Sequence, residues 1–100
     1  MLLAISRFQD PGADFEPAAD AVVAFWRECS GCLSAELVRN LDEQALWAIV
    51  SRWDSVGSYR RSFGGYEAKM VLTPVLSRAI DEPSAYLAPG ELGENLPRGI

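Results

Sequence analysis

The hydrophobic and polar positions along the chain follow two different periods. Alternation with a period of two residues, typical of strands, is interrupted by stretches in which apolar residues recur three and four positions apart, as in amphipathic helices. We expect strands at residues 2–8, 32–40, 45–53 and 83–88. We expect helices at residues 18–29, 56–63 and 66–78. The order of the elements is therefore βαββαβ, with a break between two helical pieces in the second helical region.

The first helix carries the clearest periodic signal. Val22, Phe25, Trp26 and Cys29 stand at positions i, i+3, i+4 and i+7 and form one apolar stripe. Gly31 follows, where a helix commonly ends in a left-handed residue. This stripe predicts a helix that packs an aromatic face against a sheet.

This order, with short connections, predicts an α+β fold of the ferredoxin-like type with a four-stranded antiparallel sheet. Its first and third strands lie in the centre of the sheet, and the matching stretches, residues 2–8 and 45–53, are apolar on both faces. We expect one domain over residues 1–88 and an irregular tail over residues 89–100, which is rich in Gly and Pro. Because the helices cover only one face, the other apolar face predicts a homodimer through the sheet.

Composition and charge narrow the range of partners. The chain has 100 residues and a net charge of −5. A nucleic-acid partner would require a clustered basic surface, so we expect no nucleic acid as a partner. No apolar run reaches the length of a membrane span, so we expect no membrane partner. The N-terminus lacks the features of a signal peptide, which makes the cytoplasm the expected location.

The chain contains no histidine, and this excludes several kinds of site. It excludes Ser-His-Asp and Cys-His nucleophile systems, and it removes the commonest transition-metal ligand. Cys29 and Cys32 form a C-x-x-C pair, but a zinc site would need two further ligands of the same kind. A redox-active pair would stand at the start of a helix, whereas Cys29 ends one. We therefore interpret both cysteines as packing residues, with a Cys29–Cys32 disulfide as the alternative, and we expect no metal.

Three stretches are distinctive: "SGCLSAELVRN" after the first helix, "SRWDSVGSY" at the end of the third strand, and "SFGGYEAKMVLTPVLSRA" in the second helical region. Together they resemble the antibiotic-biosynthesis monooxygenase (ABM) superfamily of dimeric α+β-barrel proteins. The "GC" between helix and strand and the W-D/E-S at the strand end are typical of that family. The similarity extends over roughly residues 2–87.

The resemblance implies a pocket between the helices and one sheet face, with a second subunit packed on the other face. Some members of the family are monooxygenases without metal or flavin, in which an electron-rich polycyclic phenol supplies electrons to oxygen once it is deprotonated. The resemblance therefore implies no cofactor. Another branch degrades haem with an Asn on the first strand, a Trp on the second helix and a His ligand. Here Ser6 and Ser62 stand at the first two positions and no His exists, so haem degradation is disfavoured.

Two groups of residues are candidates for the pocket, and for each a structural role is the alternative. The candidate catalytic residues carry a hydroxyl group or a positive charge that could bind or polarise a phenolic substrate. They are Ser6, Arg52, Tyr59 and Tyr66. Aromatic side chains that could hold a flat ligand are the candidate substrate-binding residues, Phe8, Trp26, Trp47 and Phe63. Aromatic residues at helical spacing also make ordinary cores, and Arg52 also suits a surface or interface ion pair.

Three functions are compatible with these residues. The first is a cofactor-independent monooxygenase acting on a small aromatic or polyketide-like metabolite. The second is a dimer that binds a small hydrophobic ligand, or serves as an accessory subunit, without catalysis. The third is an isomerase or decarboxylase of polyketide intermediates, which needs only a base and a partner for the oxyanion. A void between helices and sheet is required for a ligand in each case.

Overall fold

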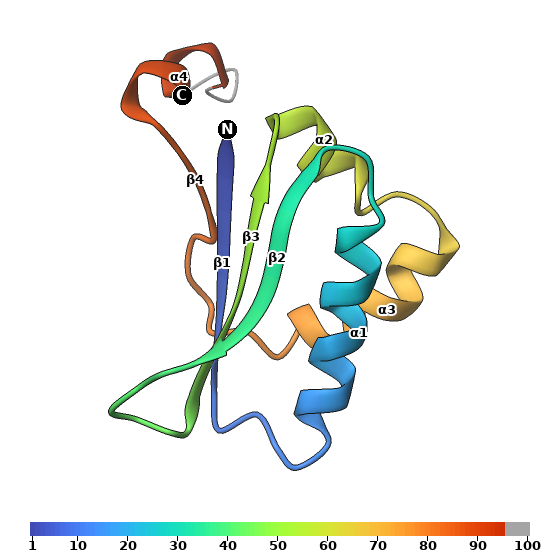
Figure 1. Cartoon of the computed structure of the whole chain (residues 1–100), viewed down its shortest axis with the longest axis vertical. Helices are drawn as coiled ribbons and strands as arrows, with labels where there is room; N and C mark the ends of the chain where they lie inside the picture. The colour runs from blue at the N-terminus through green and yellow to red at the C-terminus, as the bar shows by residue number, and fades with distance from the viewer. Residues whose placement is uncertain (96–100) are drawn as a thin grey trace.

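A computed structural model describes residues 1–95 of the chain (Figure 1). Its elements follow the expected order, with one additional helix at the end. They are β1 (Leu2–Gln9), α1 (Phe15–Arg27), β2 (Cys32–Arg39), β3 (Leu46–Trp53), α2 (Val56–Arg61), α3 (Tyr66–Leu76), β4 (Ala85–Leu87) and α4 (Pro89–Asn95).

The four strands form one antiparallel sheet in the order β2-β3-β1-β4. β1 and β3 are central, and they pair along their whole length from Leu2 opposite Trp53 to Gln9 opposite Leu46. The two strands with apolar residues on both faces are thus the two that the sheet encloses. The α+β ferredoxin-like prediction is confirmed.

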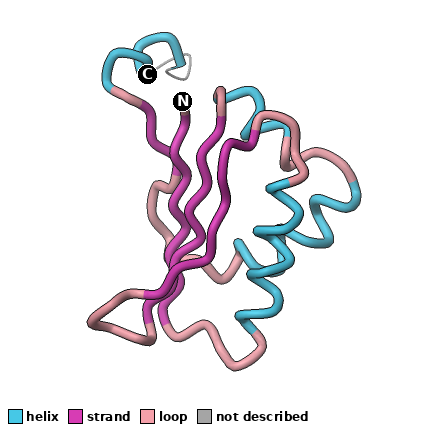
Figure 2. The backbone as a smooth tube through the Cα atoms, in the orientation of Figure 1, coloured by secondary structure: helices cyan, strands magenta, loops and turns pink. Residues whose placement is uncertain are grey.

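The molecule has two layers, with α1 and α3 on one face of the sheet (Figure 2). The core lies between the layers, because alternate residues of the central strands point toward the helices and are buried. On the sheet side it contains Leu2, Ala4, Phe8, Ala35, Ile49, Ser51 and Trp53. On the helix side it contains Phe15, Ala19, Val22, Val23, Trp26, Ala68, Leu72 and Val75.

Most boundaries lie within two residues of prediction, and the larger differences are at the start of α1 and in the tail. α1 spans Phe15–Arg27 and not residues 18–29, and at its start the buried Phe15 ring extends the apolar stripe by one turn. The irregular tail predicted for residues 89–100 is wrong for residues 89–95, which form α4. Pro89 stands at the first helical position, which its fixed φ favours, and the amide of Leu92 donates to the Ala88 carbonyl. Residues 96–100 lie outside the described part of the chain.

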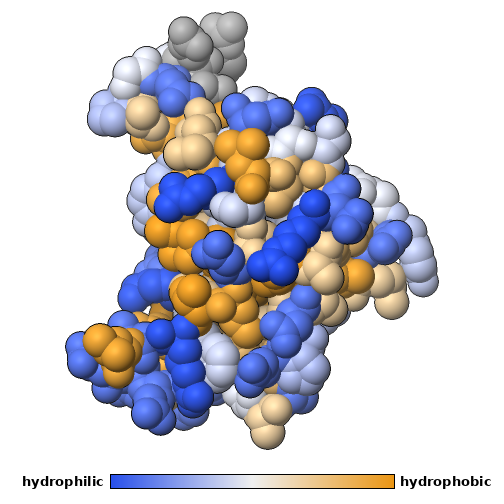
Figure 3. All heavy atoms as spheres, in the orientation of Figure 1, coloured by the Kyte–Doolittle hydropathy of each residue, from blue (hydrophilic) through white to orange (hydrophobic). Residues whose placement is uncertain are grey.

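The second face of the sheet is not covered by any helix of the described chain. Leu3 and Ile5 of β1 share this face with Ala48 and Val50 of β3, and all four side chains are only half-buried. In the space-filling view a band of apolar residues runs over the strands between charged groups (Figure 3).

The turn between α1 and β2 fits closely against the start of α2. Gly31 has a φ of +89°, and a Cβ there would overlap the Ser58 side chain and come within 2.7 Å of Asp54 Oδ1. Cys29 and Cys32 flank this turn as free, half-buried thiols, and each Sγ contacts a backbone carbonyl at 3.5 Å. Burial raises the pKa of both thiols, and nearby Glu67 adds to the rise at Cys29. These contacts support the packing role expected for the pair.

Within residues 1–95, no helix has the length and apolar character needed to cross a membrane. The same residues bring together no group of three Cys, Asp or Glu side chains that could hold a metal ion.

Candidate functional site

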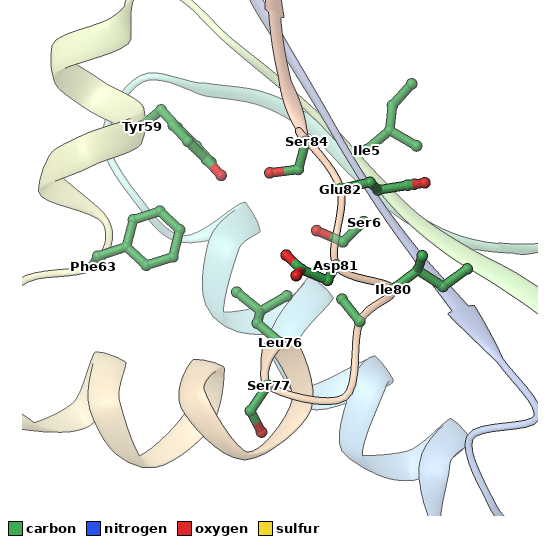
Figure 4. A pocket seen from close by; sticks show the side chains of 11 residues that line it. Ile5, Ser6, Tyr59, Phe63, Leu76, Ser77, Ile80, Asp81, Glu82 and Ser84 are labelled. Atoms are coloured by element: carbon green, nitrogen blue, oxygen red, sulfur yellow. The ribbon is translucent and has the colours of Figure 1, made fainter. Parts of the chain in front are cut away.

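A cavity of about 480 Å³ opens at the edge of β1 that the short strand β4 leaves unpaired. We call it the β1–α2 cavity, since β1 and the end of α2 supply two of its walls and the linker between α3 and β4 supplies the third (Figure 4). Its lining residues are Ile5, Ser6, Tyr59, Phe63, Leu76, Ser77, Ala79, Ile80, Asp81, Glu82 and Ser84. Its volume lies within the range of small-molecule sites.

The wall from α2 is held in place by the helix ends. The Ser55 hydroxyl caps α2 by accepting from the Ser58 amide at 3.1 Å. At the other end the chain turns at Gly65, which has a φ of +94° and begins α3. Tyr59 on α2 and Phe63 just after its C-terminal end therefore face the sheet edge from the same side (Figure 4).

The wall from the linker exists because β4 pairs with β1 only as far as Ala4. Beyond that point the linker touches β1 at two backbone hydrogen bonds, from the Ile5 amide to the Ser84 carbonyl at 2.7 Å and from the Ile80 amide to the Arg7 carbonyl at 2.8 Å. Between them the chain bulges away from the strand. The bulge is anchored by Glu82, which accepts two hydrogen bonds of 2.7 Å from the Arg7 guanidinium.

Four oxygen-bearing side chains converge on the cavity (Figure 4). They are Ser6, Tyr59, Asp81 and Ser84, and the Glu82 carboxylate points away from them toward Arg7. Burial raises the pKa of the Tyr59 hydroxyl, and a hydrogen bond with Ser84 partly opposes the rise. Tyr59 is therefore a protonated donor at neutral pH. No Lys or Arg side chain is among the lining residues, so the cavity presents hydroxyls and a carboxylate on a partly apolar wall.

A cluster of aromatic rings supports this wall from behind. The Trp26 ring meets Trp53 edge-on at 5.9 Å and lies 6.4 Å from Tyr59, and Tyr59 meets Phe63 edge-on at 5.1 Å. Trp26 Nε1 donates to the Ser62 hydroxyl at 3.1 Å, and that hydroxyl donates to the Tyr59 carbonyl at 2.6 Å. The indole of α1 thus fixes the last turn of α2, which carries the cavity residues.

Three of the eight candidate residues predicted from the sequence come together here, namely Ser6, Tyr59 and Phe63. Ser6 shares the helix-facing side of β1 with Ala4 and Phe8, as its alternation predicts.

Three other candidates belong to the core or to the opposite end of the sheet. Trp26 is 1% exposed and Phe8 is 0% exposed, so neither ring reaches a ligand in the cavity. Trp47 packs edge-on against Phe15 at 5.7 Å, and the Arg39 guanidinium lies over its ring at 4.3 Å. The Phe8 and Trp26 rings are thus packed in the core, whereas Trp47 is half-buried and lines two other pockets at the far end of β3.

The remaining two candidates, Arg52 and Tyr66, do not line the cavity. Arg52 is exposed and alternates with the buried Ser51 and Trp53, so it stands on the uncovered face of the sheet, opposite to Ser6. Tyr66 is the first residue of α3 and is 78% exposed.

Four lining residues, Leu76, Ile80, Asp81 and Ser84, were not among the candidates from the sequence. Leu76 and Ser84 fall in the helix expected at residues 66–78 and in the strand expected at residues 83–88, whereas Ile80 and Asp81 lie between these elements, where no period places a side chain. In the structure β4 begins only at Ala85, so this part of β1 faces the linker instead of a strand.

Residues 6–69 match the family model described as "Antibiotic biosynthesis monooxygenase". Among curated proteins, none matches the sequence.

The fold is similar to that of several solved structures. A variant of SnoaB, a cofactor-independent oxygenase from Streptomyces nogalater, is 20% identical with a TM-score of 0.75, over 88% of this chain and 92% of that one. A Deinococcus radiodurans protein assigned to the antibiotic biosynthesis monooxygenases is 16% identical with a TM-score of 0.71, over 88% and 92%. Rv0793 from Mycobacterium tuberculosis is 22% identical with a TM-score of 0.68, over 88% and 93%. At these identities the likeness extends to the fold alone.

Proposed function

Since the chain belongs to the antibiotic biosynthesis monooxygenase family, we propose that it is a cofactor-independent monooxygenase acting on a small aromatic or polyketide-like metabolite in the β1–α2 cavity. The observation that carries the proposal is the cavity itself, where Ser6, Tyr59 and Phe63 meet around a void of about 480 Å³. SnoaB, a cofactor-independent oxygenase with the same fold, adds support.

The lining residues suit a flat, uncharged ligand. The Phe63 ring is 39% exposed and faces the cavity, so it offers an aromatic surface for stacking. Ser6 and Tyr59 supply hydroxyls that can orient a phenol or carbonyl oxygen of the ligand. A cavity with a carboxylate and without a lining cation disfavours ligands that carry a carboxylate of their own.

In the proposed reaction the deprotonated substrate supplies the electrons, and dioxygen is the oxidant. A methylene group becomes a carbonyl group, one oxygen atom enters the product, and the other leaves as water with the two hydrogen atoms. The role of the protein is to hold the substrate and to stabilise the negative charge on its oxygen. Tyr59 suits this role, since its half-buried hydroxyl is a protonated donor that a hydrogen bond with Ser84 helps to hold in place.

We also propose that two copies associate through the uncovered face of the sheet. This face carries half-buried apolar residues from both central strands, including Ile5 and Val50. Each Val, Ile or Leu side chain that becomes fully buried there contributes roughly 1.5–3 kcal/mol. Arg52 stands on the same face, where an ion pair across the interface is its proposed role.

Oxygen uptake with anthrone or a quinol as substrate tests the enzymatic proposal. We expect wild-type protein to consume oxygen above the buffer rate, and we expect Tyr59→Phe to lower kcat by about 100-fold, since one donor to an oxyanion contributes about that factor. Tyr66→Phe is the matched control, because Tyr66 is exposed at the start of α3, and it should keep the wild-type rate.

Other results would contradict the proposal in different ways. Binding of the aromatic compound without oxygen uptake would favour the non-catalytic reading or the isomerase. A loss in Tyr66→Phe equal to that in Tyr59→Phe would place the reaction outside the β1–α2 cavity.

A further inference from the structure

Two adjacent carboxylates on the linker have different surroundings. Glu82 is paired with the Arg7 guanidinium through two hydrogen bonds of 2.7 Å, and it points away from the cavity (Figure 4). Asp81 lines the cavity, and its oxygens point into it. Among residues 1–95, no hydrogen bond or ion pair engages the Asp81 carboxylate. The linker therefore neutralises one carboxylate and leaves its neighbour available to a ligand.

The cavity places a donor across from this acceptor. Tyr59 comes from α2, on the other side of the cavity, and its hydroxyl points toward the interior (Figure 4). Burial raises the pKa of Tyr59, which keeps it a donor at neutral pH. A carboxylate base opposite a protonated tyrosine is an arrangement that removes a proton from carbon next to a carbonyl, since the tyrosine stabilises the oxyanion that forms.

We propose that Asp81 is the general base of this site and Tyr59 the donor to the substrate oxyanion, for an uncharged aromatic ketone with an acidic C–H bond conjugated to its carbonyl. The inference deepens the proposed function and relies on the same cavity. Ser6 and Ser84 also line the cavity, so their hydroxyls are available to hydrogen-bond the substrate.

The proton-transfer step needs no oxidant. The C–H bond breaks, its electron pair enters the conjugated ring system, and the proton passes to an Asp81 carboxylate oxygen. The carbonyl oxygen becomes an enolate oxygen that accepts a hydrogen bond from Tyr59. Dioxygen would then oxidise the enolate in a separate step, so the two steps can be measured independently.

Hydrogen–deuterium exchange of anthrone under nitrogen isolates the first step. Wild-type protein in deuterated buffer should speed the exchange of the anthrone methylene hydrogens. Proton NMR measures this exchange as the loss of the methylene signal. Asp81→Asn should lower the protein-dependent rate by at least about 100-fold, the usual contribution of a positioned base. Asp81→Glu should restore part of the rate, and Tyr59→Phe should also lower it.

Asp42→Asn is the matched control. Asp42 is an exposed carboxylate in the turn between β2 and β3 and is not among the cavity's lining residues, so its replacement should leave the exchange rate unchanged. Because Asp81 is exposed, Asp81→Asn should fold normally, and circular dichroism melting checks this.

The outcomes separate this inference from the proposed monooxygenase activity. Exchange that is unchanged in Asp81→Asn, or absent from the wild-type protein, overturns the assignment of Asp81, whatever the oxygen uptake shows. Exchange that depends on Asp81 without oxygen uptake upholds the base and overturns the monooxygenase proposal, and it favours an isomerase or decarboxylase.

Discussion

At the scale of single residues, the buried polar groups behind the cavity all have hydrogen-bond partners. The Trp26 indole, the Ser62 hydroxyl and the Tyr59 carbonyl form a chain of hydrogen bonds, and Trp53 Nε1 donates to the buried Ser51 hydroxyl at 2.9 Å. No buried side-chain nitrogen or oxygen in the described chain lacks a partner. A buried donor without a partner costs about 1–3 kcal/mol, so these serines are needed for the tryptophans to pack.

Gly31 gives a prediction at the same scale. Replacement by Ala would strain a backbone with φ +89° and force its Cβ into Ser58 and Asp54. We expect Gly31→Ala to lower the free energy of unfolding by roughly 2–5 kcal/mol, the sum of a left-handed conformation and overpacking. Urea denaturation measures the change.

Gly65→Ala is the control for that experiment. Gly65 has a similar φ of +94°, but nothing lies within 4 Å of its Cβ position. Its replacement should cost only the backbone contribution, about 1–2 kcal/mol. Equal losses in the two variants would show that the fit of Gly31 against Ser58 adds nothing to stability.

At the scale of elements, the linker between α3 and β4 is the least constrained wall of the cavity. None of residues 77–84 is fully buried, and between its two backbone hydrogen bonds to β1 the bulge is held to the strand by the Arg7–Glu82 pair. Exposed ion pairs contribute little to global stability. We therefore infer that the Arg7–Glu82 pair holds the linker in position and adds little to the free energy of unfolding.

Glu82→Gln tests this assignment. The variant should show faster amide hydrogen exchange at residues 81–84, while the melting temperature changes little because the pair is exposed. The pairing lowers the pKa of Glu82 below its ordinary value of 4.5, through the hydrogen bond with Arg7 and then its charge. Its stabilising effect is therefore complete above about pH 4.5 and is lost as the pH falls through the lower value in the folded protein.

Two results check the pH dependence. The difference between wild-type protein and Glu82→Gln should be present at neutral pH and should vanish in acid. A difference that persists in acid would show that the carboxylate acts through something other than its charge.

The elements themselves were predictable from the sequence, and the cavity was only partly so. The stripe of Val22 and Trp26 and the alternation of β1 are periodic signals, because one face of each element is buried. Those signals placed Ser6 on the same face as Ala4 and Phe8, but they did not decide which face of the sheet the helices cover. They could not separate a core ring such as Trp26 from a lining ring such as Phe63, since both repeat with the helix. They contained nothing about Asp81, because an irregular linker has no period.

At the scale of the whole molecule, the uncovered sheet face gives a prediction about association. We expect a dimer at micromolar concentration, and Val50→Asp should weaken it by at least about 100-fold, since an unpaired charge buried at an interface costs about 3–5 kcal/mol. Sedimentation velocity measures both. Met70→Asp on α3 is the control, since Met70 is 58% exposed away from the sheet and its change should leave the dimer intact.

A compact wild-type monomer at micromolar concentration would contradict the proposed association. Equal weakening in Val50→Asp and Met70→Asp would show that the interface does not lie on the sheet.

The position of the linker has an evolutionary consequence. The family match ends at residue 69, and the stretch that supplies Asp81 comes after it. Substitutions in residues 77–84 remove no fully buried side chain, so they can accumulate without loss of the fold. The linker can therefore diverge faster than the core around it. We expect that exchanging this segment between relatives, with Asp81 kept in place, transfers substrate preference, in the way that loops are exchanged on an antibody framework.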